Sequence, residues 1–346
     1  MTYSMHEEDL NEVRDEAMDV LHECREIPIP AARYDWLYRQ NPDGNAALWS
    51  VRQQKTGKMV GFTVALPRRV LVDGQIRTAW NGADFSILKP FRALGIALKL
   101  RRAAKDGIDN GRADFLYAHP NSTMQVIHEK VGHRSIGTMV RYAIPLKSSF
   151  YIENRFGSRI AGRCLGPVVD QALRWTSPAT YHRAHSKLTW EEAPTFDARF
   201  DRLFADAQLA RPVIGVRDAA YLQWRYAENP LYPTHAVLAE SEGKLRGFAL
   251  IQPEGNVWHL KDVFCETVGT WDKDLLAAVL QQARRCGIAS VSATFLDGFP
   301  LESTFTAFGF QRRSTVSQMM GYKAESDSGP ELDSSAWWLS VGDRDV

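Results

Sequence analysis

The sequence contains one pattern twice, and the two copies keep the same internal order. Residues 36–42 read WLYRQNP, and residues 224–230 read WRYAENP. Residues 57–62 (GKMVGF) likewise match residues 243–248 (GKLRGF). Three further matches follow in order: Pro67 with Pro253, Asp84 with Asp262, and residues 131–133 with 308–310. Chance does not keep such matches in sequence, so the chain is predicted to consist of two homologous halves.

Each half is predicted to contain the same succession of elements: a helix, two or three strands joined by tight turns, a helix, a strand, a helix and a strand. The amphipathic pattern of residues 7–25 predicts the first of these helices. The predicted division is a first domain at 1–145, a linker with a helix at 146–190, a second domain at 191–323 and a C-terminal tail at 324–346.

The composition argues against several classes of protein. A formal net charge of +1 over 346 residues gives no reason to expect nucleic-acid binding. No apolar run approaches the roughly 20 residues that cross a bilayer, and the N-terminus is too acidic and polar for a secretory signal. The four cysteines are scattered and lack metal-ligand spacing. They are typical of reduced thiols, so we expect a cytoplasmic protein without a metal. The sequence does not indicate the oligomeric state.

The stretch at 84–104 carries the clearest chemical signal. It begins as a strand, breaks at Lys89-Pro90 and continues as a helix, with Arg92-x-x-Gly95-x-Ala97 at the turn. A helix N-terminus exposes free N–H groups and the positive end of the helix dipole, which favour an anion. Glycine allows close approach of a ligand to the backbone, and arginine adds a fixed positive charge. The turn therefore predicts a phosphate or pyrophosphate site, the alternative being a device for packing the helix on its strand.

This turn resembles the acyl-CoA signature of the GNAT acyltransferase superfamily, Arg/Gln-x-x-Gly-x-Gly/Ala, which that family places between its fourth strand and third helix. The resemblance implies an α+β fold with two GNAT-like domains, each a mixed, mostly antiparallel sheet flanked by helices. It also implies acetyl-CoA or another acyl-CoA as co-substrate, without a metal. The residues that the resemblance assigns to the co-substrate are Leu88, Arg92, Ala93, Leu94, Gly95, Ile96, Ala97 and Asn121.

Residues 117–133 resemble the second CoA motif of the same superfamily, in which an asparagine opens a helix that ends near a Glu-Lys-x-Gly sequence. Asn121 matches the asparagine that contacts the pantetheine arm, although it is also a good N-cap. His128 stands where the superfamily usually has the tyrosine that protonates the CoA sulfur, so His128 is a candidate acid. Asp84 and His119 are candidate general bases, because both lie close to where the attacking amine is expected. A buried structural carboxylate is the alternative for Asp84, and a packing or surface role is the alternative for each histidine.

The second half lacks this chemistry. Residues 265–273 occupy the position of the CoA turn, but they contain no Arg-x-x-Gly-x-Gly/Ala sequence. Glu266 and Asp272 in this stretch would repel a pyrophosphate. The second half is therefore expected to have lost CoA binding, and either to complete the acceptor site or to brace the fold.

The expected function is an acyl-CoA-dependent N-acyltransferase that acts on a primary amine without a covalent acyl-enzyme. The overall sequence is similar to bacterial tandem GNAT proteins associated with surface polysaccharides, which implies an amino sugar as the acceptor. Two alternatives remain open: a transferase of larger acyl or aminoacyl groups, and a non-catalytic CoA-binding scaffold.

Overall fold

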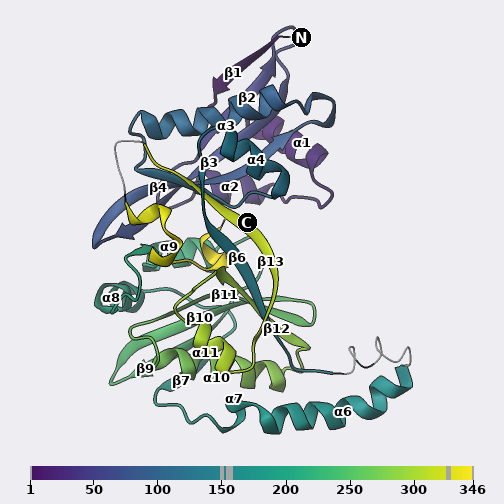
Figure 1. Cartoon of the computed structure of the whole chain (residues 1–346), viewed down its shortest axis with the longest axis vertical. Coiled ribbons are helices and arrows are strands. Elements are labelled where there is room, and N and C mark those ends of the chain that lie inside the picture. The colour runs from purple at the N-terminus through teal and green to yellow at the C-terminus, as the bar shows by residue number, and fades with distance from the viewer. Residues whose placement is uncertain (1, 149–151, 153–158, 325–328, 345–346) are drawn as a thin grey trace.

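The computed structural model describes residues 2–148, 152, 159–324 and 329–344. Within these ranges the strands form one 14-stranded sheet with the order β1-β2-β3-β4-β5-β13-β6-β12-β11-β10-β9-β7, while β8 and β14 attach beside β3. The first half forms one end of the elongated molecule and the second half the other (Figure 1). The expected mixed, mostly antiparallel sheet flanked by helices is confirmed.

The first half follows the predicted order, with a strand added at its start and a second helix added after the first. Its elements are β1 (Tyr3–Glu7), α1 (Arg14–Cys24), α2 (Ala32–Tyr38), β2 (Ala47–Gln53), β3 (Met59–Val72), β4 (Gln75–Ile87), α3 (Leu94–Asp109), β5 (Phe115–Ala118), α4 (Ser122–Lys130) and β6 (Arg134–Pro145). The single helix expected at 7–25 was too long: Glu7 ends a strand that pairs antiparallel with β2, and α1 begins only at Arg14. Because β2 supplies the partner for this short polar segment, the local sequence pattern did not reveal it.

The second half repeats this order after a helical connection. Its elements are α6 (Arg159–Thr176), α7 (Pro178–Tyr181), β7 (Lys187–Glu191), α8 (Ala198–Asp206), β8 (Val213–Gly215), α9 (Ala219–Leu222), a π-helical turn (Gln223–Ala227), β9 (His235–Ser241), β10 (Lys244–Glu254), β11 (Val257–Cys265), α10 (Trp271–Arg285), β12 (Ser290–Leu296), α11 (Glu302–Ala307) and β13 (Gln311–Tyr322). The segment expected to be a tail contains three short 3₁₀ turns and β14 (Trp337–Trp338), which pairs with β8.

The two halves exchange their last strands. In the first half, β6 leaves β5 and pairs with β12 of the second half. In return, β13 of the second half pairs with β5 of the first half, and β6 and β13 pair with each other at the centre. Neither half therefore completes its sheet with its own strands.

The repeated tryptophans meet at the contact between the halves. The rings of Trp36 and Trp224 stack with centroids 5.3 Å apart. Each indole Nε1 donates a hydrogen bond to the backbone carbonyl of the other tryptophan, at 2.8 Å in both directions. Both side chains are buried. The repeat thus forms a reciprocal contact that relates the halves by an approximate twofold axis.

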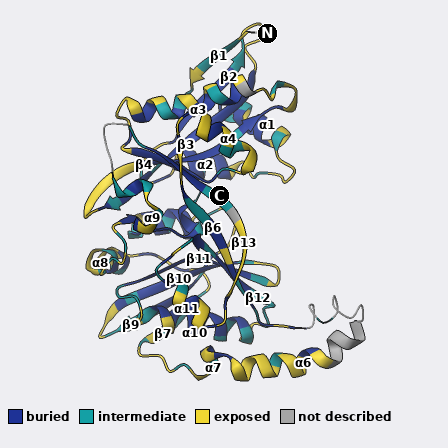
Figure 2. Cartoon of the chain, viewed as in Figure 1, coloured by how far each residue is buried: buried dark blue, intermediate teal, exposed yellow. Residues whose placement is uncertain are grey.

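Helix α6 differs from the other long helices because it projects from the body of the molecule (Figure 1) and is largely exposed along its described part (Figure 2). The large apolar side chains that it exposes are Leu165, Val168, Val169, Leu173 and Trp175. Among the helices that the structure describes, none is long and apolar enough to cross a bilayer.

The reciprocal tryptophan contact can be tested with Trp36→Phe. This change keeps an aromatic ring but leaves the buried carbonyl of Trp224 without its donor, so the free energy of unfolding should fall by about 1–3 kcal/mol in urea denaturation. The control is Trp175→Phe on the exposed face of α6, which should change stability by no more than about 0.5 kcal/mol. Equal effects of the two changes would contradict the structural role of the pair.

Candidate functional site

The sheet opens between β4 and β5. These strands pair in parallel only from Ala79 opposite Phe115 to Gly82 opposite Ala118. Beyond Gly82, β4 continues to Ile87 and pairs there with β3 alone. Since β5 ends at Ala118, the part of β4 from Ala83 to Ile87 has one edge without a strand. This opening lies directly before the turn that leads into α3.

The N-terminus of α3 is suited to an anion. Its N-cap residue, Ala93, has extended backbone angles, and no side chain caps the helix. A side chain added at Gly95 would meet no atom within 4 Å, so the backbone there is accessible. The Arg92 side chain lies beside the turn and donates from Nε to the carbonyl of Ile87 at 3.0 Å. Free N–H groups, the helix dipole and this guanidinium together favour a phosphate group.

The corresponding turn of the second half is closed by its own carboxylate. Asp272 lies in the first turn of α10 and is completely buried. Its side chain accepts hydrogen bonds from the backbone N–H of Gly269 at 2.7 Å and from the Thr304 hydroxyl at 2.6 Å. Glu266 is held by Arg246 at 2.7 Å. The Asp272 carboxylate therefore occupies this helix terminus, where it would repel a phosphate group.

Asp84 lies on β4 two residues beyond the last pair with β5, and its backbone has a positive φ of 41°. The carboxylate is buried and forms ion pairs with Arg25 and with Arg33, the latter at 2.7 Å. It also accepts a hydrogen bond from the Tyr38 hydroxyl at 2.6 Å. Burial alone would raise the pKa of Asp84, but these partners, Arg33 first, lower it below its usual value. A carboxylate held in this way is a weak proton acceptor and a strong structural anchor.

His119 follows the last residue of β5, next to the opening. The residue is 9% exposed, and neither ring nitrogen has a hydrogen-bond partner among the described residues. Burial, and then the positive charge of Arg344, lower the pKa of His119 well below its usual value. The ring is therefore neutral at physiological pH and has a lone pair available, as a general base requires.

His128 lies beside another histidine, His133. Its Nδ1 lies 2.9 Å from Nδ1 of His133, with both rings buried. Burial, and then Arg101, hold the pKa of His128 well below its usual range and lower that of His133 to about 3. Both rings are consequently neutral, and one donates to the other. Asn121 caps α4 by accepting from the backbone N–H of Met124 at 2.9 Å.

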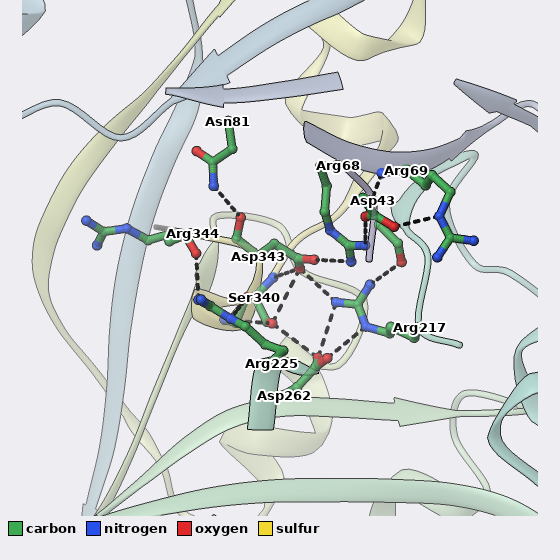
Figure 3. Close-up of polar contacts among 12 residues, drawn as sticks. Asp43, Arg68, Arg69, Asn81, Arg217, Arg225, Asp262, Ser340, Asp343 and Arg344 are labelled. Atoms are coloured by element: carbon green, nitrogen blue, oxygen red, sulfur yellow. Dashed lines mark hydrogen bonds and ion pairs between the residues drawn. The ribbon is translucent and has the colours of Figure 1, made fainter. Parts of the chain in front are cut away.

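Residues 340–344, which no sequence pattern singled out, lie near the C-terminal end between the two halves (Figure 1) and form the polar contacts drawn in Figure 3. The carbonyl of Asp343 accepts hydrogen bonds from Asn81 of β4 at 3.2 Å and from the Tyr117 hydroxyl of β5 at 2.9 Å. Its carboxylate pairs with Arg217 at 2.7 Å and with Arg68 at 3.5 Å. Burial opposes ionisation, but these two arginines lower the pKa of Asp343. The C-terminal segment thus joins the strands beside the opening to the second half.

The repeated carboxylate of the second half belongs to the same network. Asp262 binds Arg217 through two hydrogen bonds, at 2.8 and 3.2 Å, and accepts from the Ser340 hydroxyl at 3.1 Å. Each half therefore holds its repeated aspartate with buried arginine. The matching positions of Asp84 and Asp262 were the only sequence signal that pointed to this network.

A structural role for Asp84 predicts a large loss of stability in Asp84→Asn. The change leaves Arg25 and Arg33 without their carboxylate, so the free energy of unfolding should fall by about 3–5 kcal/mol. The folded-state pKa lies below the unfolded value, so the contribution is fully present above about pH 4 and is lost as the pH falls through the folded-state pKa.

The measurement is urea denaturation of both proteins from pH 7 to pH 3, where the difference should shrink with decreasing pH. Asp297→Asn is the control, because Asp297 forms an exposed ion pair with Arg312 and should contribute no more than about 1 kcal/mol. A near-normal stability of Asp84→Asn together with a lost activity would instead favour a catalytic role.

No family model and no curated protein sequence matches the chain. Solved structures match it in fold. A protein of Enterococcus faecalis V583 described as a probable N-acyltransferase has a TM-score of 0.67 at 12% identity, over 94% of this chain and 73% of that one. A GCN5-related N-acetyltransferase from Anabaena variabilis has a TM-score of 0.66 at 14% identity, over 94% of this chain and 74% of that one.

Saccharomyces cerevisiae N-myristoyltransferase, solved with bound myristoyl-CoA, has a TM-score of 0.59 at 12% identity. That similarity extends over 99% of this chain and 85% of the yeast chain. At such low identities the similarity concerns the fold alone. The chain therefore has the fold of the GCN5-related N-acetyltransferases.

Proposed function

We propose that the protein transfers an acyl group from an acyl-CoA thioester to a primary amine. The observation that carries this proposal is the opening between β4 and β5 beside the uncapped N-terminus of α3. An extended thioester substrate fits such an opening, with its phosphates at the helix terminus and its reactive end between the strands. The Arg92-x-x-Gly95-x-Ala97 sequence at this terminus supports CoA as the carrier.

In this proposal the free backbone N–H groups at the start of α3 bind the pyrophosphate, with Arg92 adding positive charge. The N–H groups of Ile96 and Ala97 already donate to the carbonyl of Ala93. Leu88 is buried, so it contributes through its backbone alone. Asn121 lies at the start of α4, on the other side of the opening, and contacts the pantetheine arm. The closed terminus of α10 in the second half leaves one acyl-CoA site per chain among the described residues. The second half then braces the fold and contributes to the acceptor site.

The reaction needs one proton acceptor and one proton donor. The amine nitrogen attacks the thioester carbonyl, a C–N bond forms, the C–S bond breaks, and the amine proton passes to a base. His119 is the preferred base, because its ring is neutral, unpartnered among the described residues and next to the opening. Asp84 is a weaker candidate, since its carboxylate is held by two arginines. The neutral state of His128 favours protonation of the departing thiolate by solvent.

The finer parts of the proposal come from the resemblance to the superfamily. They are an acetyl group as the transferred acyl group, an amino sugar as the acceptor and a cytoplasmic location. The described cysteines, Cys24, Cys265 and Cys286, are free thiols, which suits a reducing compartment. Cys164 lies among residues whose side chains are not described.

Calorimetric titration of acyl-CoA into Gly95→Glu tests the binding site. The substitution adds a carboxylate at the exposed terminus of α3, where space is available, so folding should be retained while acyl-CoA binding weakens at least 100-fold. Lys273→Glu also places a carboxylate in the first turn of a helix, that of α10 in the second half, and should leave binding unchanged. Titrations of acetyl-CoA and myristoyl-CoA in parallel determine the acyl length that the site accepts. Absence of binding to the wild type would refute the proposal.

His119→Gln tests the catalytic assignment. We expect acyl-CoA binding to remain within about twofold of the wild type, while amine-dependent release of the CoA thiol falls by about 100-fold or more. Thiol release is followed with a chromogenic disulfide reagent across a panel of amino sugars and other amines. A wild type that binds acyl-CoA but releases no thiol with any amine would favour the non-catalytic scaffold.

A further inference from the structure

The second half contains a cavity that the proposed acyl-CoA site does not use. Its volume is about 240 Å³, and it lies between the π-helical turn, β10, β11 and the C-terminal segment. Its walls include three cationic side chains: Arg225, Lys261 and Arg344. Tyr226, Tyr232 and Gln252 also line the cavity with polar groups. No carboxylate side chain lines the cavity within the described residues.

Hydrogen bonds to the C-terminal segment fix one of these cations. Arg225 is buried and donates from Nε to the carbonyl of Gly342 at 3.2 Å. It also donates from Nη2 to the carbonyl of Arg344 at 2.6 Å (Figure 3). Both acceptors are neutral carbonyls, and Arg225 forms no ion pair within the described part of the chain, so its positive charge is held at the cavity wall.

Lys261 contributes a second uncompensated charge. It lies at the irregular position of β11, where the pairing with β10 shifts between Leu250 opposite Asp262 and Ile251 opposite Leu260. Within the described part of the chain its Nζ forms no ion pair, and it lies 6.0 Å from the centroid of the Tyr232 ring.

The electrostatic surroundings of Lys261 show that positive charge accumulates here. Burial, and then Arg225, lower the pKa of Lys261 to about 8, with a further contribution from Arg344. Glu254 acts in the opposite direction, but its exposed side chain is paired with His259 at 3.1 Å. An anion in the cavity would relieve this repulsion.

The cations distinguish the second half from the first. Lys261 immediately follows Leu260, the last residue of β11 paired with β12, just as Ala83 follows Gly82 in β4. Arg225 follows Trp224, and its counterpart after Trp36 is the buried Leu37. The second half therefore has charged residues where the first half has small or apolar ones, at the equivalent end of its parallel strand pair.

We propose that this cavity is a binding site for the anionic group of a small molecule, either a carboxylate or a phosphate. A site with three cations and no lining acid offers both charge and N–H donors to such a group. The Tyr117 hydroxyl donates to the carbonyl of Asp343, between two cavity-lining residues, and the Tyr117 ring lies 6.0 Å from that of His119, so the cavity lies near the proposed acyl-transfer site. An amine acceptor that carries an acidic group is the ligand that fits both sites, a step that rests on the proposed function. Anion binding itself does not rest on that function.

The direct test is a calorimetric titration of inorganic phosphate and of succinate, at constant ionic strength, into the full chain. Saturable binding of at least one probe is expected, and the stronger probe identifies the preferred anion. Lys261→Gln should weaken that binding at least tenfold. Arg344→Gln should also weaken it, and it leaves the backbone carbonyl that Arg225 uses unchanged. Lys273→Gln, at an exposed position of α10 in the same half, is the matched control and should bind like the wild type.

The pH dependence provides a second readout. Succinate carries the same charge from pH 7 to pH 9.5, so its affinity should fall above about pH 8 as Lys261 loses its proton. Arg225, Arg344 and Glu254 are the charged groups that act on Lys261, and the nearby His259, whose pKa is lowered, stays neutral in this range. The dependence should be absent in Lys261→Gln.

Two results would overturn the proposal. One is that neither anion binds the wild type saturably. The other is that both Lys261→Gln and Arg344→Gln bind with wild-type affinity. Because neither probe contains an acyl group or an amine, these outcomes are independent of whether acyl-CoA binds at α3. A chain that binds anions here but no acyl-CoA would keep this proposal and refute the proposed function.

Discussion

The exchange of β6 and β13 joins the two halves of the molecule into one sheet. The hydrogen-bond edge of β5 that faces away from β4 is completed by β13, which comes from the end of the chain. The corresponding edge of β12 is completed by β6 from the first half. Since unpaired strand edges are costly inside a fold, neither half is complete until the whole chain is present. The reciprocal hydrogen bonds of Trp36 and Trp224 add a second contact between the two halves.

The two halves share a scaffold but differ at the ends of their parallel strand pairs. In the first half, the terminus of α3 is uncapped and accessible, and the nearby Ala83 and Leu37 are buried small or apolar residues. In the second half, Asp272 fills the terminus of α10, and cations occupy the positions equivalent to Ala83 and Leu37. The same backbone thus provides two different electrostatic environments, because a few side chains at matching positions were changed.

The repeated aspartates were matched in the sequence, and the structure holds both as buried carboxylates. Asp84 and Asp262 match in the two halves, and both are buried against arginine. A base for catalysis must keep a free lone pair, whereas these carboxylates use their oxygens in ion pairs and hydrogen bonds. His119 has the opposite surroundings, with two ring nitrogens that have no partner among the described residues.

Local sequence patterns predicted a duplication and the order of most elements. They also predicted an anion site at the turn of Arg92 and Gly95, which stays a prediction. These features depend on local periodicity, helix termini and repeated spelling, all of which are written in neighbouring residues. The strand exchange, the partners of Asp84 and the central position of residues 340–344 could be seen only in the folded structure. Those features depend on which distant segments become neighbours. A stretch such as Ser340 to Arg344, polar and without periodicity, carries no local sign that it will be buried between two halves.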